Sequence, residues 1–331
     1  MRFAFVGNEA VGRYVDACLT RAGFERAQDI DSTQVVFTYV TYASGLEDAY
    51  FEDNGLVKLA AEGTLLVDLS PSSPAFAREV SAIATVNNLR FVEAPLYMLD
   101  ASMTDFYGAT DVFGCYVAGE EADVDDARPL LEAIASTVEY VGDIGCAQLA
   151  KATHTVQATA AFASAIEAEA LCRVVGEATN SVDGPLGFVR PLSDMADDAL
   201  RAVVEQRFDG DFTVEMLMGD VAAAMATADD VDLILPQLES VMHLLELLAV
   251  IGGADKAPAA LSLLYRSEEE SASHGLDWRR AEEFYAESDH HHGDDDYDDY
   301  DDDYDDYDDY DDRGMNGRGG YAGGFGGYSA N

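Results

Sequence analysis

The sequence predicts an α/β protein in which a Rossmann-type parallel-sheet domain is followed by an all-α domain and a disordered acidic tail. Three observations support this. The chain opens as an apolar run, a glycine turn and a helix, and short apolar runs then alternate with helical segments. After residue 146 only helical spacing recurs. Strands that alternate with helices are typical of a parallel sheet with helices on both faces, and 331 residues suffice for two domains.

The first strand, residues 2–6, leads into a glycine turn and a helix that ends at Gly23. This is the opening of a dinucleotide-binding unit, in which the pyrophosphate lies at the positive end of the helix. Glu9, however, replaces the middle glycine of G-x-G-x-x-G. A carboxylate ~4 Å from a phosphate charge costs roughly 4 kcal/mol at an effective dielectric near 20, so cofactor binding requires Glu9 to point away or to be neutralised. Otherwise its carboxylate itself occupies the anion site of the helix.

The next segment, residues 25–34, is polar, and a strand at 35–40 begins directly after it. A complete Rossmann half has a second strand, a helix and a third strand here, so about twenty residues are missing. Asp29 or Asp31 remains available for a ribose hydroxyl, with a solvated loop as the alternative for both. Further strands are expected at 65–69, 90–94, 114–118 and 139–141, and helices at 75–87 and 122–135.

Residues 146–175 contain neither glycine nor proline and are rich in alanine, which predicts one helix of roughly 45 Å. It is apolar on all sides, so we expect both flanks to be covered. A membrane span is the alternative, which Lys151, His154 and Glu167 disfavour. Lys151 lies in the first turns, where the helix dipole disfavours a cation. Its ammonium either reaches solvent along the surface or acts as a general acid at the mouth of a cleft between two domains.

Beyond this helix the pattern predicts only helices, at 193–205, 214–228, 234–250 and 257–265. The expected organisation is a truncated Rossmann domain (1–146), an all-α domain with the long interdomain helix (147–265), a charged linker or helix (266–288) and a disordered Asp/Tyr- and Gly-rich tail (289–331). The tail is expected to be solubilising or weakly self-associating, with metal chelation by its histidines and aspartates as the alternative. The helices at 146–176 and 234–250 carry more apolar face than one domain covers, which predicts a homodimer.

The net charge of −45 restricts the partners. Fifteen aspartates and two arginines from Asp289 onward account for −13, so the rest of the chain carries −32. Nucleic acid is excluded as a partner, because phosphate contacts require positive charge. The four cysteines lack metal-ligand spacing, and the first residues form a strand rather than a secretory leader, so we expect a cytoplasmic protein with free thiols and without a metal.

The order of these segments resembles the β-hydroxyacid dehydrogenase family, typified by 3-hydroxyisobutyrate dehydrogenase. The resemblance covers about residues 1–265 and is carried by the motifs at 7–12, 67–74, 91–95, 141–151 and 212–220. It implies NAD or NADP as cofactor and a C-terminal domain like that of 6-phosphogluconate dehydrogenase. A related branch, the imine reductases, usually lacks a lysine at the place of Lys151, so its presence favours alcohol and carbonyl chemistry.

The resemblance also implies roles for individual residues. Lys151 matches the family's general acid/base, and Ser70 matches a residue beside the nicotinamide. The cofactor-binding candidates are Gly7, Asn8, Glu9, Ala10, Val11, Gly12, Tyr39, Val40, Thr41 and Ser70. The loop after Pro95 corresponds to the one that holds the substrate carboxylate. The substrate-binding candidates are Tyr97, Met98, Leu99, His154 and Asp220.

The chain departs from the family's pattern in several places. The family's Ser-Gly-Gly is Tyr97, Met98 and Leu99 here, so small donors are replaced by bulky groups. The amide one turn after the lysine is His154, and the lysine before Asp220 is Gly219. The function predicted is an NAD(P)-dependent oxidoreductase that passes hydride between nicotinamide and a carbonyl or alcohol carbon of a small molecule. The alternative, favoured by Glu9 and the missing segment, is a non-catalytic binding or scaffolding module.

Overall fold

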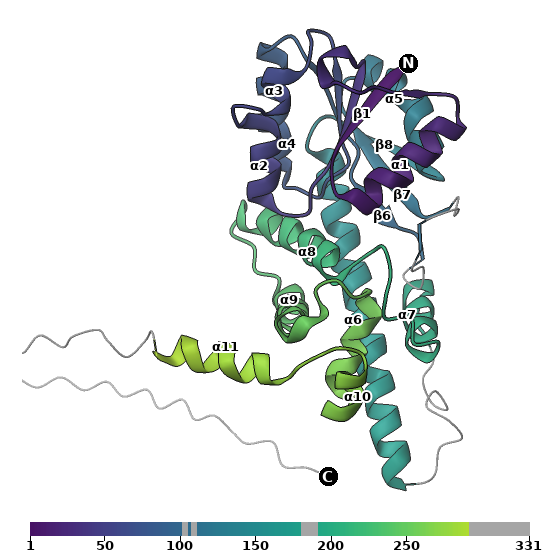
Figure 1. Cartoon of the computed structure of the whole chain (residues 1–331), viewed down its shortest axis with the longest axis vertical. Helices are drawn as coiled ribbons and strands as arrows, with labels where there is room; N and C mark the ends of the chain where they lie inside the picture. Colours follow the sequence, from purple (N-terminus) through teal and green to yellow (C-terminus); the bar gives the residue numbers. More distant parts are fainter. Residues whose placement is uncertain (101–104, 107–110, 180–190, 291–331) are drawn as a thin grey trace, which may run out of the picture. The chain divides into compact units, whose positions relative to one another are not determined.

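The computed structural model describes residues 1–100, 105–106, 111–179 and 191–290 (Figure 1). The predicted acidic tail lies outside the described residues from residue 291 onward. Its first two residues, Asp289 and His290, instead belong to the last helix. None of the helices in the described ranges is both long enough and apolar enough to cross a lipid bilayer.

In the described part of the chain, eight strands form one sheet in the order β2-β1-β3-β4-β5-β7-β6, with β8 paired to β7. The pairs among β1 to β5 are parallel, as predicted. Strand β7 runs antiparallel to β5 and β6 and parallel to β8, so the far end of the sheet is mixed. The bounds are β1 (Arg2–Gly7), β2 (Glu25–Arg26), β3 (Val35–Tyr39), β4 (Leu65–Asp68), β5 (Arg90–Glu93), β6 (Leu96–Met98), β7 (Phe113–Ala118) and β8 (Thr137–Gly142).

The shortened edge of the sheet corrects one prediction. We expected a strand at 35–40 directly after the polar segment 25–34, with about twenty residues of a complete Rossmann half missing and no strand assigned within that segment. A two-residue strand, β2, remains and pairs with the start of β1. The carbonyls of Met1 and Phe3 accept hydrogen bonds from the N–H groups of Glu25 and Ala27, which satisfies this short edge. A single 3-10 turn, η1 (Ile30–Ser32), then leads directly to β3.

Both faces of the sheet are buried, because alternate residues of its central strands enter two separate hydrophobic clusters. Phe37 and Val67 belong to the cluster that includes residues of α1 and α5. Their neighbours Val36 and Leu66 belong to the cluster that includes residues of α2, α3 and α4. The helices are α1 (Glu9–Arg21), α2 (Ala43–Phe51), α3 (Leu56–Leu59), α4 (Pro74–Val86) and α5 (Glu121–Ile134).

The remaining elements in the described residues are helices, as predicted, connected by loops that include an isolated bridge between Asp209 and Lys256. Two boundaries differ from the prediction. The helix expected at 234–250 passes into a π-helical turn, because Gly252 adopts a φ of 103° that ordinary helical backbone excludes. The segment expected as an α-helix at 257–265 is a 3-10 helix. The elements are α6 (Cys146–Thr179), α7 (Asp194–Val204), α8 (Val214–Asp229), α9 (Pro236–Leu248), η2 (Ala249–Gly253), η3 (Pro258–Tyr265), α10 (Glu268–Ser273) and α11 (Arg279–His290).

Helix α6 connects the sheet to the helical region, since it contacts β7 and β8 as well as α7, α8 and α9 (Figure 1). Its 34 residues confirm the single long helix expected from the sequence. The expectation that both flanks are covered is wrong for the last turns, where Leu171 is 68% and Val174 52% exposed. Only the part of α6 beside α7 and α8 is a buried central helix.

Candidate functional site

The start of α6 is held at the carboxyl ends of two adjacent strands. Glu93, the last residue of β5, accepts hydrogen bonds from the N–H groups of Gly145 (2.6 Å) and Ala147 (2.9 Å). These N–H groups have no partner within the helix, and the helix dipole stabilises the carboxylate there. Burial nevertheless raises the pKa of Glu93 to about 7, and it also raises the pKa of Asp68, its neighbour on β4, to about 7.

Gln148, one turn before Lys151, makes a second set of hydrogen bonds that holds the start of α6. Its side-chain oxygen accepts a hydrogen bond from the N–H of Ser72 at 3.0 Å, and its amide nitrogen donates to the carbonyl of Ser70 at 2.9 Å. All three of these residues are buried. The loop after β4 and the first turn of α6 therefore form one rigid unit, which fixes the direction in which Lys151 projects.

Lys151 is buried, with 4% of its surface exposed. Its Nζ donates to Oδ2 of Asp220 on α8 at 2.6 Å. An ammonium that reaches solvent, the first interpretation of this lysine, is therefore wrong. Burial raises the pKa of Asp220, an effect that Lys151 opposes. The other carboxylate oxygen of Asp220, Oδ1, is buried without a hydrogen-bond partner.

Three aromatic rings, those of Tyr97, Tyr116 and His154, contact one another beside this ion pair. Tyr97 on β6 stacks on Tyr116 with ring centroids 4.9 Å apart and lies 4.6 Å from the ring of His154. Burial, followed by the charge of Lys151, lowers the pKa of His154 to about 4, so this imidazole is neutral near pH 7. A Cβ added to Gly114 would lie 2.3 Å from the Tyr97 ring, so the glycine on β7 makes room for the tyrosine.

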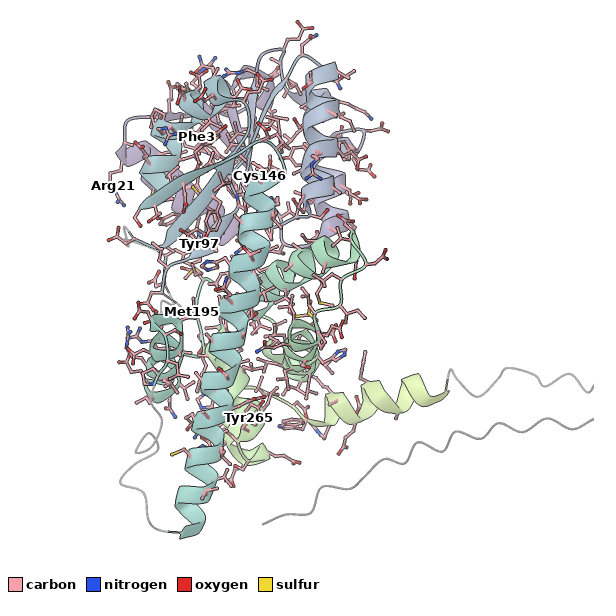
Figure 2. All side chains as sticks on the ribbon, turned by 180° about the vertical axis from the view of Figure 1, so that it is seen from behind. Phe3, Arg21, Tyr97, Cys146, Met195 and Tyr265 are labelled. Atoms are coloured by element: carbon pink, nitrogen blue, oxygen red, sulfur yellow. The ribbon has the colours of Figure 1, made fainter. Side chains whose placement is uncertain are left out.

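The ion pair, Tyr97 and His154 lie in the wall of a pocket of about 60 Å³. Phe162, Met195 and Pro258 are among its apolar lining residues. Figure 2 shows Tyr97 and Met195 beside successive parts of α6, with Cys146 at its start. The complete lining is Tyr97, Met98, Lys151, His154, Thr155, Ala158, Thr159, Phe162, Met195, Phe212, Leu217, Asp220 and Pro258.

A second cavity, of about 580 Å³, lies at the carboxyl ends of β1 and β3. It is lined by the glycine turn, the loop after β3, helix α2 and the start of α8. Asp48, Glu52 and Glu215 contribute carboxylates to its wall. The complete lining is Val6, Gly7, Asn8, Val40, Thr41, Tyr42, Gly45, Asp48, Ala49, Glu52, Asn54, Glu215 and Met216.

Glu9, in the glycine turn, points away from the larger cavity. The Glu9 carboxylate bonds to Arg13 at 3.1 Å with 86% of the Glu9 side chain exposed, and Glu9 does not line the cavity. The helix is capped instead by Asn8, whose Oδ1 accepts from the N–H groups of Ala10 (3.0 Å) and Val11 (3.1 Å). Asn8 therefore holds two of the N–H groups with which a Rossmann helix usually binds phosphate.

The other candidates fall into two groups. Tyr97, Met98, His154 and Asp220 line the smaller pocket with Lys151, and Gly7, Asn8, Val40 and Thr41 line the larger cavity. Tyr39, Val11 and Gly12 are buried and line neither. Ser70 is fully buried, and its hydroxyl accepts from the N–H of Val40. Leu99 follows Met98 in the sequence but does not line the smaller pocket.

Similarity to known proteins agrees with this arrangement. Residues 8–142 match the NAD-binding domain of 6-phosphogluconate dehydrogenase. An uncharacterised oxidoreductase of Bacillus subtilis, YkwC, is 23% identical over 70% of this chain and 78% of its own length. The 3-hydroxyisobutyrate dehydrogenase of Pseudomonas aeruginosa is 25% identical over 62% of this chain and 69% of its own. In sequence, the chain is thus similar to members of the β-hydroxyacid dehydrogenase family.

The fold of this chain is also found in a solved structure. The crystal structure of 3-hydroxyisobutyrate dehydrogenase (ygbJ) from Salmonella typhimurium superposes with a TM-score of 0.64. That superposition covers 80% of this chain and 99% of the other, at 19% identity. The long helix α6 and the helices after it therefore follow the family's architecture, while the sequence has diverged.

Two departures from the family have visible structural causes. The family's lysine before Asp220 is excluded, because a Cβ on Gly219 would lie 2.2 Å from the carbonyl oxygen of Thr41. The segment in place of the Ser-Gly-Gly loop is strand β6, and the N–H of Leu99 at its end is bound to the carbonyl of Val112. That N–H is not available to a ligand.

We predicted no role from the sequence for four residues of this region, Glu93, Gln148, Thr155 and Tyr116. Glu93 and Gln148 lie inside motifs that carried the family resemblance, and their polar side chains in otherwise apolar segments were the available signal. Thr155 lies four residues after Lys151, so helical spacing places both on one face of α6. The contact between Tyr116 and Tyr97 depends on pairing between β6 and β7, which are far apart in the sequence.

Proposed function

We propose that this protein is an NAD(P)-dependent oxidoreductase that transfers hydride between nicotinamide and a carbonyl or alcohol carbon of a small molecule. The observation that carries the proposal is the buried Lys151 ammonium, held 2.6 Å from Asp220 in the wall of an otherwise apolar pocket. A lysine is rarely buried without a task, and proton transfer to a reacting oxygen is a task that needs a positioned, water-excluded donor.

The residues around the larger cavity fit a nucleotide in shape. Gly7 has a φ of 119°, and a Cβ there would lie 2.0 Å from the carbonyl oxygen of Tyr39, so only glycine permits this turn. The first turn of α2, which begins after Tyr42, has no side-chain cap. Gly7, Asn8, Val40, Thr41 and Tyr42 would hold the cofactor, which supplies the hydride when bound. The similarity of residues 8–142 to an NAD-binding domain supports this assignment.

Lys151 and Asp220 would handle the proton. As a carbonyl carbon gains hydride, its oxygen gains a proton from the Lys151 ammonium, and the alcohol is released; oxidation of an alcohol runs the same steps in reverse. Asp220 orients the ammonium and keeps the buried pair neutral overall before transfer. His154 is neutral near pH 7 and offers a hydrogen bond to the same oxygen without adding charge.

The non-catalytic alternative has less support. It rested in part on Glu9, whose carboxylate would repel a phosphate at the anion site of α1. That carboxylate bonds to Arg13 instead, and two N–H groups of the site are capped by the neutral side chain of Asn8. The shortening of the segment before β3 still favours the alternative. It removes contacts to the adenosine half of a dinucleotide, however, and leaves the proton-transfer groups in place. A scaffold also has no need of an ion pair buried in a pocket wall, since such pairs rarely add net stability.

The nucleotide site is expected to bind more tightly as salt is added. Asp48, Glu52 and Glu215 repel phosphates, and neither lysine nor arginine stands among the lining residues. Raising ionic strength from 0.01 to 1 M shortens the screening length from about 30 to about 3 Å, so the dissociation constant should fall several-fold. Titration of the protein with NADH and with NADPH at each ionic strength measures this.

Glu215→Gln is the matched variant for that titration. It should bind nucleotide more tightly at low salt and show a flatter salt dependence, because one repelling charge is gone. Glu239→Gln, which changes a half-buried carboxylate on α9 outside that cavity, serves as the control. Affinity that weakens with salt would contradict the charge argument. A folded protein that binds neither nucleotide at millimolar concentration would contradict the oxidoreductase proposal.

We further propose that the protein is cytoplasmic and forms a homodimer through the helical region. All four cysteines, Cys18, Cys115, Cys146 and Cys172, are free thiols, which suits a reducing compartment. The last turns of α6 expose Leu171 and Val174 on one helical face. Sedimentation at micromolar concentration is expected to show a dimer, and Leu171→Glu should shift the distribution toward monomer. A monomer in the unmodified protein would contradict the assembly proposal.

A further inference from the structure

The pocket beside Lys151 has a strongly uneven chemistry. Lys151 is the only lysine or arginine among its described lining residues, and its charge is balanced by Asp220 at 2.6 Å. His154 adds no positive charge near neutral pH. A second anion, such as a substrate carboxylate, would make the buried site net negative. Burying a carboxylate without a dedicated counter-charge carries a large desolvation penalty.

The place where a carboxylate would be held is also filled. Tyr97 and Met98 belong to strand β6 and face Gly114 and Phe113 across the β6–β7 pair. The Tyr97 ring lies over Gly114 and packs against both Tyr116 and His154, so it does not swing aside to expose backbone donors. An aromatic surface thus replaces the anion-binding loop that the family's motif provides.

Two buried polar atoms in the same wall are left without partners. The hydroxyl of Thr155, a residue only 3% exposed, has no hydrogen-bond partner, and neither has Oδ1 of Asp220. Leaving buried polar atoms unpaired is costly, so such atoms in a pocket point to a ligand that completes them. Thr155 and Lys151 lie on one face of α6 and Asp220 faces them from α8, which suits one oxygen-bearing end of a ligand.

We propose that this pocket binds a small uncharged alcohol or carbonyl compound whose oxygen meets Lys151, Asp220 and Thr155, whose remainder is apolar, and which carries no carboxylate. The proposal rests on the oxidoreductase function above and specifies its substrate class. The pocket volume of about 60 Å³ admits only a small ligand. A branched four-carbon alcohol or aldehyde is a small ligand of this class, and its apolar end would contact Phe162, Met195 and Pro258.

The reaction balances without a further reactant. The alcohol carbon loses a hydride, with two electrons, to the oxidised nicotinamide supplied by the proposed activity. The Lys151 ammonium first releases its proton to solvent, and the amine formed then takes the proton of the alcohol oxygen. The products are the aldehyde or ketone and the reduced nicotinamide. None of these steps requires a charged group on the rest of the substrate.

The test compares two alcohols that differ at a single position. Isobutanol and 3-hydroxyisobutyrate share a skeleton, and one methyl group of the first is a carboxylate in the second. Saturation-transfer NMR on the full chain measures binding of each without a cofactor, and nucleotide reduction measures turnover separately. We expect saturable binding of isobutanol and at least about tenfold weaker binding of 3-hydroxyisobutyrate, since the carboxylate would be buried unpaired.

Two variants locate the effect in this pocket. Ala158→Leu fills the pocket and should abolish isobutanol binding. Met195→Arg places a cation at a half-buried apolar position of the lining and should bring 3-hydroxyisobutyrate binding at least to the level of isobutanol. Thermal melting of both variants checks that they fold. If one fails to fold, the other still tests the location.

The outcomes separate the substrate class from the proposed function. Isobutanol that binds and responds to Ala158→Leu supports the class even if neither nucleotide is reduced, and that result would count against the oxidoreductase proposal alone. Binding or oxidation of 3-hydroxyisobutyrate in preference to isobutanol overturns the class and leaves the oxidoreductase proposal standing. Failure of both alcohols to bind also overturns the class.

Discussion

Replacing Lys151 by methionine is expected to lower turnover by roughly 10²–10⁴ while leaving nucleotide affinity within about twofold. The side chain lines the smaller pocket and not the larger cavity, so it is placed to act on a substrate oxygen and not on the nucleotide phosphates. Methionine keeps the length and apolar stem of lysine, which limits the loss of packing. Steady-state rates and nucleotide titration on the same preparation measure both quantities.

The matched control is Lys58→Met, the same substitution at a surface ion pair. Lys58 bonds to Asp53 at 2.9 Å, but its side chain is half exposed and Asp53 is fully so. Exposed pairs of this kind contribute little to stability, so rate and melting temperature should stay close to those of the parent protein. Turnover in Lys151→Met equal to that of Lys58→Met would show that Lys151 is not the proton donor.

The sequence was sufficient for the order of the longer strands and of most helices, because local patterns determine that order, but α2, α3, β2 and β6 were not predicted. The glycine turn at Gly7 and the glycine-free run that forms α6 are visible without any tertiary contact. The burial of Lys151 was an open alternative, since helical position alone does not show what covers a side chain. Its partner Asp220 lies on another helix, and only the family resemblance connected the two.

The sequence contained the local signals for the position of Glu9, although we left several alternatives open for its carboxylate and the structure shows only one of them. Glu9 and Arg13 have the spacing of a helical ion pair, and Asn8 is a preferred N-cap residue. By contrast, strand β6 is three residues long and exists through its pairing with β7. Its register places Tyr97 opposite Gly114, and that long-range match determines the aromatic wall of the pocket. Short strands with distant partners leave little trace in a local pattern.

Removing only the carboxylate of the buried pair, with Asp220→Leu, is expected to lower the free energy of unfolding by about 3–5 kcal/mol. The Lys151 ammonium would then be buried without a counter-charge, since Asp220 is the acidic group that it contacts. Lys151→Met should also destabilise, because it leaves the Asp220 carboxylate buried and its pKa, already raised by burial, without the opposing lysine. Urea unfolding of each variant measures these losses.

The double variant Lys151→Met, Asp220→Leu is expected to recover most of the stability lost in either single variant. Apolar groups of similar volume often replace a buried ion pair at little or no cost. The double-mutant cycle should therefore show strong coupling, whereas simple additivity of the two losses would mean that the charges do not depend on each other. A double variant that is as stable as the parent and yet inactive would separate the two roles of the pair. Retention of the charges would then be explained by proton transfer to the substrate, because the fold does not require them.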